Sequence, residues 1–220
     1  EDPSLTFLAP ILGDDGMPDG RYFAVWTTTP WTVPSNSGLA VHPDLTYVEA
    51  EAGGRRIVLA RDRAEAVLGD GARIVGEMAG RQLVGLRYQR PVDYVPEPDE
   101  PGGGWTVVAE DFVSADDGTG IVHMAPAFGA DDYAAGQRHD LPMFQPLDDA
   151  GHFREGLPVV GGLFVKDADP EVVKDLEARG LLWKHEMEPH SYPHCWRCRS
   201  PLIYMARASW FAATSTVKDQ

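Results

Sequence analysis

Short strand-like runs, separated by turn signals, limit what this chain can fold into. The runs are rich in β-branched and aromatic side chains, which favour extended backbone. They are Leu5–Leu12, Tyr22–Thr27, Leu45–Ala52, Arg56–Ala60, Arg73–Met78, Trp105–Ala109 and Ile121–Met124. Gly53-Gly54 between two of the runs predicts a hairpin, and Asp148–Gly151 predicts a turn. The pattern predicts a β-rich, barrel-like sheet.

Few segments of the sequence indicate helices. The clearest is Pro170–Arg179, with Asp169 as a cap before it and Gly180 after it. Two shorter helices are expected near Asp131–His139 and Arg63–Leu68. We therefore expect a single domain of the α+β class, in which a barrel-like, β-rich sheet carries a few short peripheral helices.

The charge balance limits how this chain can meet nucleic acid. It contains 19 Lys and Arg against 34 Asp and Glu, a formal net charge of −15. Because contacts to phosphates need a basic face, so acidic a chain is not expected to wrap a nucleic-acid backbone. Neither a membrane-spanning helix nor a signal peptide is expected from the apolar pattern. The presence of only two cysteines favours a reducing, cytoplasmic compartment.

A threonine-rich turn is the first candidate for chemistry. Thr27, Thr28, Thr29 and Thr32 follow a predicted strand, and Pro30 bends the chain among them. Their hydroxyls can hold a ribose, a carbonyl oxygen or a water molecule. Threonines are also common in strands and turns, so the pattern taken alone fits a turn without a site better.

The second candidate is the segment that leads from a glycine turn to a predicted helix. Gly118–Gly120 precedes a buried strand with a single histidine, His123, and the helix then opens with Asp131 and Asp132. Either feature alone has a structural explanation, because a lone histidine is often a core residue and acids suit a helix N-terminus. The small residues between them leave space in which His123 and one acid could face one cavity.

The third candidate is a Cys-x-x-Cys pair. Cys195 and Cys198, beside His190 and His194, have the spacing of half a zinc site. A closed zinc site needs four ligands. The two that the cysteines do not supply would have to come from the two histidines or from residues after Gln220. A redox role is less favoured without a βαβ context. Neither a Gly-rich phosphate loop nor a G-x-S-x-G elbow occurs, so any hydrolysis is expected to use water as the nucleophile.

Taken together, these motifs resemble isoleucyl-tRNA synthetases, in their inserted editing domain (connective peptide 1). The matching segments are Trp26–Thr32, Ala40–Pro43, Gly118–Pro126, Asp131–Tyr133, His190–Trp196 and Trp210-Phe211. The sister enzymes for valine and leucine typically carry Thr-Thr-Arg-Pro where this chain has Thr28-Thr29-Pro30-Trp31, which favours the isoleucine branch. The nucleotide-binding signatures of the synthetic site are missing, as expected for an insert alone.

The resemblance implies hydrolysis of misacylated Val-tRNA(Ile). Asp132 would bind the α-ammonium of the substrate, and His123 would line the pocket and orient the ester. Trp31 would form part of an apolar wall, and the four threonines would position adenosine, ester and water. The expected catalytic residues are Thr28, Thr29, His123 and Asp132, and the expected substrate-binding residues are Thr27, Trp31, Thr32, His123 and Asp132. Family members often have a second histidine where this chain has Phe128, so no role is carried over to that position.

The resemblance also implies the partners. They are the acceptor end of tRNA(Ile) carrying valine and, in cis, the rest of a synthetase that uses ATP and Mg²⁺. Residues 1–220 are expected to be one editing domain of a monomeric fragment, with 1–20 and 189–220 as connections towards the catalytic domain. No cofactor is expected, apart from the Cys195/Cys198 half-site. The rival interpretations are a non-catalytic module that holds the acceptor end, a zinc-ribbon interaction domain, and an editing domain for valine or leucine.

Overall fold

The computed structural model of the chain describes residues 2–97, 104–188, 193–199, 201–210, 212 and 214. Within this part, one mixed sheet contains all the strands. They are β1 (Asp2–Leu12), β2 (Pro18–Thr27), β3 (Gly38–Val41), β4 (Thr46–Ala52), β5 (Arg55–Ala60), β6 (Arg73–Ala79), β7 (Thr106–Ala109), β8 (Ile121–Met124) and β9 (Leu182–Glu188). The helices are α1 (Ala64–Leu68), α2 (Ala130–His139) and α3 (Val165–Ala178), with short 3-10 turns at Pro30–Ser35, Arg61–Arg63 and Gly80–Gln82.

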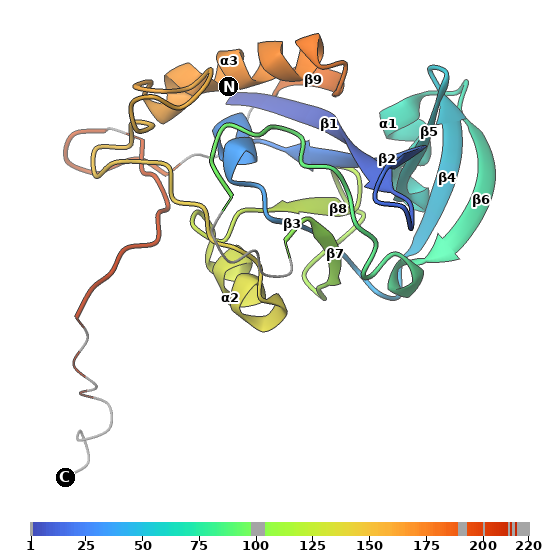
Figure 1. The fold of residues 1–220 in the computed structure, drawn as a ribbon, viewed down its shortest axis with the longest axis horizontal. Coiled ribbons are helices and arrows are strands. Elements are labelled where there is room, and N and C mark those ends of the chain that lie inside the picture. The colour runs from blue at the N-terminus through green and yellow to red at the C-terminus, as the bar shows by residue number, and fades with distance from the viewer. Residues whose placement is uncertain are drawn as a thin grey trace.

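The sheet curls into a half-barrel (Figure 1). Its strand order is β6-β4-β5-β2-β8-β3-β7, and β1 pairs with β2 and β9. Strand β2 divides one of its edges between two parallel neighbours: Arg21–Phe23 pairs with β5, whereas Trp26 pairs with Val122 of β8. The α+β, barrel-like fold with few helices predicted from the sequence is confirmed.

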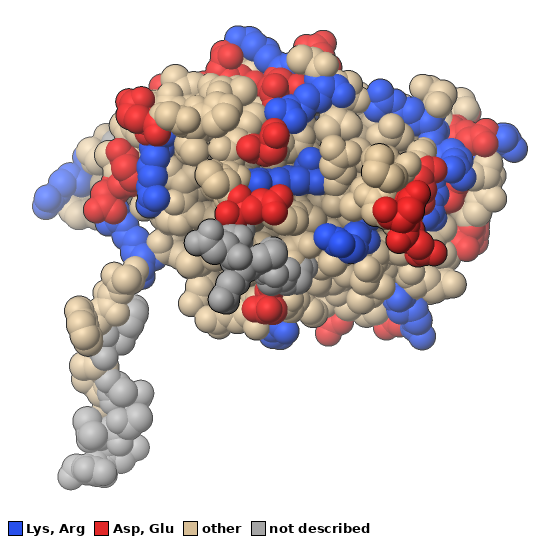
Figure 2. Space-filling model, in the orientation of Figure 1, with Lys and Arg blue, Asp and Glu red and all other residues tan. Residues whose placement is uncertain are grey.

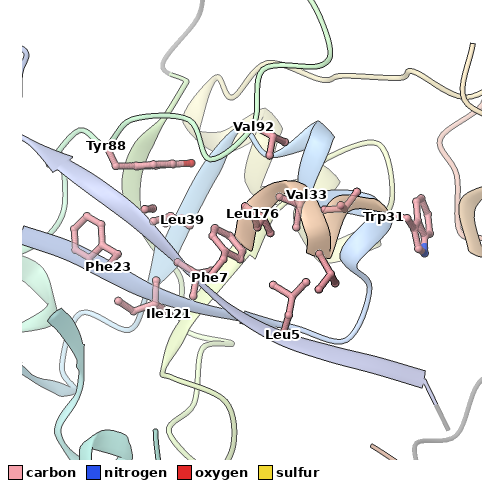
Figure 3. Packing of buried hydrophobic residues seen from close by; sticks show 14 of the residues in the cluster. Leu5, Phe7, Phe23, Trp31, Val33, Leu39, Tyr88, Val92, Ile121 and Leu176 are labelled. Carbon is pink, nitrogen blue, oxygen red and sulfur yellow. The ribbon is translucent and has the colours of Figure 1, made fainter. Parts of the chain in front are cut away.

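The core lies between the sheet and helix α3. Figure 3 shows Leu5 and Phe7 of β1 among the buried apolar side chains, together with Leu176 of α3. Helix α3 presents a stripe of fully buried residues, Val165, Ala168, Val172 and Leu176, at helical spacing. The segment 1–20, expected as a connection, thus includes a strand that packs in the core.

The predicted strands all occur, and the structure adds β3 and β9. All four residues of β3 are buried, so its sequence lacks the alternation that marks a half-exposed strand. Helix α3 begins at Val165 rather than Pro170, because its buried stripe starts there. The predicted cap at Asp169 is therefore wrong, and this residue lies inside the helix. No helix in the described part of the chain is long and apolar enough to cross a membrane.

Candidate functional site

The topology of the sheet brings the threonine turn to the histidine strand. Trp26 at the end of β2 pairs with Val122, so Thr27 lies beside His123 on β8. On its other edge, β8 pairs with β3, where Leu39 lies opposite His123. These pairings join segments that are almost a hundred residues apart in the sequence.

The threonine hydroxyls form a connected network in the turn. Oγ1 of Thr27 accepts the backbone N–H of Thr29 at 3.1 Å and lies 3.2 Å from Oγ1 of Thr29. Oγ1 of Thr32 donates to the carbonyl oxygen of Thr29 at 2.8 Å and lies 3.3 Å from its Oγ1. Within the described chain, the Thr28 hydroxyl forms no hydrogen bond, so it remains available to a ligand.

His123 is a buried, neutral imidazole. Its Nε2 lies 3.1 Å from Oγ1 of Thr32, and its Nδ1 lies 2.8 Å from Nδ2 of Asn36. Burial lowers the pKa of His123 to about 4. Because an amide nitrogen only donates, we assign Nδ1 as an acceptor and place the proton on Nε2. His123 can therefore orient Thr32. Its two ring nitrogens are both already engaged, one by Thr32 and the other by Asn36.

Asp132 stands in the first turn of α2. Its Oδ2 accepts the backbone N–H of Ala125 at 2.8 Å, which fixes the carboxylate against the segment after β8. Burial raises the pKa of Asp132, and the neighbouring charge of Asp131 raises it further, whereas the bond from Ala125 lowers it. The carboxylate is half-buried, so a positive group brought into contact with it would be strongly favoured.

One cavity of about 310 Å³ collects these side chains. From the predicted site it is lined by Thr27, Thr28, Thr29, Thr32, His123 and Asp132. The glycine turn Gly118–Gly120 and Phe128 complete much of its wall. Thr28 and Asp132 thus face the same hollow, so the threonine turn and the segment that carries His123 and Asp132 converge on it.

The structure places Trp31 in the core, whereas it was expected in an apolar wall of the pocket. It does not line the cavity but is buried in the core, with its ring 4.9 Å from that of Phe128 in an edge-to-face contact. Its backbone N–H donates to Oδ1 of Asp169 at 2.8 Å. The buried carboxylate of α3 thereby anchors the threonine turn from a residue 138 positions away.

Sequence reasoning missed Asn36 and Asp169 as supports of the site. Asn36 is fully buried, and its amide contacts His123 across 87 positions of the chain. No local pattern marks this supporting role for either residue, because each acts through a contact that only the tertiary fold creates.

The cysteine pair lies in the C-terminal part of the chain, away from the cavity. Cys195 and Cys198 form no disulfide, and the N–H of Arg199 donates to the carbonyl of Cys195 at 2.8 Å. His190 lies outside the described residues. Among the residues that are described, no group of three or more His, Cys, Asp or Glu is arranged to hold a metal ion.

A second cavity of about 560 Å³ is lined in part by the segment that joins β8 to α2. Its wall includes Ala127, Tyr133, Met143, Tyr204 and Arg207. None of the predicted site residues lines it, so size alone does not mark the candidate site.

The chain resembles curated isoleucine–tRNA ligases along most or all of its length. It is 43% identical over 221 residues to that of Streptomyces avermitilis, covering 100% of this chain and 21% of the relative. The Thermobifida fusca protein is 48% identical over 197 residues, covering 89% of this chain and 18% of the relative. The chain thus spans about a fifth of the length of these relatives. A scan of protein-family models gave no match.

Solved structures share the fold. The crystal structure of GlLeuRS-CP1 superposes with a TM-score of 0.64 at 15% identity, covering 86% of this chain and 99% of that one. The cytosolic leucyl-tRNA synthetase editing domain of P. knowlesi superposes with a TM-score of 0.60 at 10% identity, covering 81% and 95%. Sequence similarity and fold together show that the chain belongs to the isoleucyl-tRNA synthetase family, as a domain with the CP1 editing fold.

Proposed function

We propose that this chain hydrolyses the ester of misacylated Val-tRNA(Ile). The observation that carries the proposal is the convergence of threonine hydroxyls, a neutral imidazole and a half-buried carboxylate on one cavity of about 310 Å³. That volume is at the lower end of the range for small-ligand sites, about 300–1,000 Å³. It suits an aminoacyl ester rather than a large polymer segment.

The need for a second site follows from the energetics of size discrimination. One methylene in an apolar pocket is worth only about 1–3 kcal/mol, and the handling of isoleucine against valine is the standard example of this limit. An editing site that admits valine and excludes isoleucine multiplies the selectivity of the synthetic site. Phe128 and Gly120 line the cavity, and the wall that they form supports such a sieve.

The site residues suggest a division of labour. The carboxylate of Asp132 pairs with the α-ammonium of the substrate, a charge-assisted contact. The hydroxyls of Thr28 and Thr29 hold the ester and the attacking water, and His123 fixes the turn through Thr32. Because the nitrogens of His123 are both engaged, the proposed rate enhancement rests on positioning and hydrogen bonding rather than on a covalent intermediate.

The charge of the chain is compatible with an acceptor-end substrate. Figure 2 shows acidic and basic side chains interspersed over one face, without a continuous basic patch. We propose that this domain receives only the single-stranded acceptor end, while the rest of a synthetase holds the body of the tRNA.

The test is deacylation of Val-tRNA(Ile) compared with Ile-tRNA(Ile), at high concentration of the chain. Release of valine with retention of isoleucine supports the proposal. Hydrolysis of neither ester would favour the non-catalytic module. Preferential hydrolysis of Thr-tRNA(Val) or of mischarged leucine tRNA would instead assign the domain to a sister enzyme.

A further inference from the structure

A buried tyrosine lies behind the site without touching the cavity. Tyr88 is 1% exposed, and Figure 3 shows its ring among the packed apolar side chains. Its hydroxyl donates to Oδ1 of Asn36 at 2.6 Å. Since Asn36 contacts His123, the phenol is two contacts away from His123 and three away from the threonine turn.

The surroundings of Asn36 permit only one orientation of its amide. Oδ1 accepts from Tyr88, while Nδ2 donates to the carbonyl oxygen of Gly38 at 3.1 Å as well as facing His123. The backbone carbonyl of Asn36 accepts from the indole of Trp105 at 3.1 Å, which holds the residue in place. Reversing the amide would place its oxygen against the Gly38 carbonyl and its NH₂ against the phenol.

The orientation of the amide sets the direction of the hydrogen bonds beyond it. With Nδ1 of His123 accepting, Nε2–H donates to Oγ1 of Thr32. Because Thr32 donates its own proton to the Thr29 carbonyl, it can only accept from the Thr29 hydroxyl. Of the two lone pairs of Thr29 Oγ1, one faces the Thr27 hydroxyl and the other is left for the cavity. There it can accept a hydrogen bond from a bound water and turn the oxygen of that water towards the ester.

We propose that Tyr88 is a positioning residue, whose hydroxyl orients Asn36, selects the Nε2–H tautomer of His123 and thereby polarises the threonine network towards water. This inference rests on the proposed function, because the water concerned is the nucleophile of that reaction. It extends the site to a residue outside the cavity and outside every motif singled out in the sequence.

The first measurement is the tautomer of His123 itself, determined from the ¹⁵N chemical shifts of histidine-labelled chain at neutral pH. The expected result is a protonated Nε2 and an unprotonated Nδ1. In Tyr88→Phe, which removes only the hydroxyl, we expect a second tautomer to become populated. The kcat for Val-tRNA(Ile) deacylation should fall by about ten- to a hundredfold, with KM changed less than about twofold.

Tyr94→Phe is the matched control. Tyr94 is also buried, and its hydroxyl donates at the same distance, 2.6 Å, to Asp175 of α3, outside the cavity lining. This variant should leave the His123 tautomer and kcat unchanged, although it loses a comparable hydrogen bond. If Tyr88→Phe does not fold, Asn36→Asp replaces the amide donor by an acceptor of the same size and should move the proton to Nδ1.

Three results would overturn the inference. One is an Nδ1–H tautomer in the unmodified chain. Another is a Tyr88→Phe variant that keeps both the tautomer and kcat. The third is a fall in kcat that occurs equally in Tyr94→Phe or without any tautomer change. If the unmodified chain does not deacylate Val-tRNA(Ile), the proposed function fails, whereas the tautomer measurement still decides the role of Tyr88.

Discussion

Oγ1 of Thr32 lies 3.1 Å from Nε2 of His123, although 91 positions separate the two residues in the chain. The contact ties the threonine turn to strand β8 through two side chains that are both buried. An imidazolium there would be poorly solvated and would face the NH₂ group of Asn36. The neutral imidazole is therefore part of what holds the site together.

The stability of the chain should fall as the pH is lowered from about 6.5 to about 4. The pKa of His123 is about 4 in the fold against 6.5 for an ordinary histidine, so the unfolded chain binds more protons in this interval. The contribution of His123 to the unfolding free energy is fully present above pH 6.5 and amounts to roughly 3 kcal/mol. Urea denaturation across this pH range measures it.

His123→Gln serves as the control for that dependence. It removes the titrating group and keeps the surface histidines, so its unfolding free energy should vary less over the same interval. A variant with the same pH slope as the unmodified chain would show that other groups cause the loss.

Asp132→Asn should lower deacylation of Val-tRNA(Ile) by about a hundredfold or more, because an amide cannot pair with the substrate ammonium as a carboxylate does. Since burial raises the pKa of Asp132, the fold does not favour its ionised form. The unfolding free energy at neutral pH should therefore stay the same or increase. Initial rates and chemical denaturation measure the two effects.

The matched control is Asp131→Asn, which makes the same change one residue earlier in the same helical turn. Asp131 is exposed and does not line the cavity, so this variant should retain its activity. Equal losses in both variants would mean that negative charge at the start of α2, rather than contact with the substrate, is what matters.

The sequence predicted those parts of the molecule that are encoded locally. The strand-like runs, the Gly53-Gly54 hairpin and helix α2 follow from side-chain type and spacing. The grouping of the threonines with His123 and Asp132 came from two of the motifs and from a family resemblance. The predicted form of helix α3 was too short. Proline is typical of the first position of a helix, so Pro170 indicated a start there, although the buried stripe begins before it.

The supports of the site could not be predicted in the same way. The contact of Tyr88 with Asn36 spans 52 positions, and that of Trp31 with Asp169 spans 138. In each case an ordinary core residue acquires its role from a partner that only the tertiary fold brings near. Tyrosine and asparagine in short loops carry no spacing signal that separates this role from simple packing.

Gly120→Ala should lower the unfolding free energy by about 2–4 kcal/mol. Gly120 has φ +71°, and a Cβ atom there would lie 2.3 Å from Cβ of Ala60, a contact that requires backbone movement. Its carbonyl also accepts a hydrogen bond from the hydroxyl of Tyr47 at 2.7 Å.

Gly85→Ala is the control, because Gly85 has φ +86° but no described heavy atom near the added Cβ. This variant should lower the unfolding free energy by about 1 kcal/mol. Similar losses in both variants, measured by chemical denaturation, would show that backbone conformation alone sets the effect.

The chain alone should bind tRNA(Ile) weakly, with a Kd of about 10 µM or more at physiological salt. A net charge of −15 opposes association with a polyanion, and the proposed site engages only the single-stranded end. Few counterions are then released, so the logarithm of the affinity should fall only gently with the logarithm of the salt concentration, by about 0.7 per phosphate contacted. Fluorescence anisotropy of labelled tRNA at increasing salt measures both quantities. Tight binding that salt does not weaken would contradict an acceptor-end site, because it would require a large interface of another chemical kind.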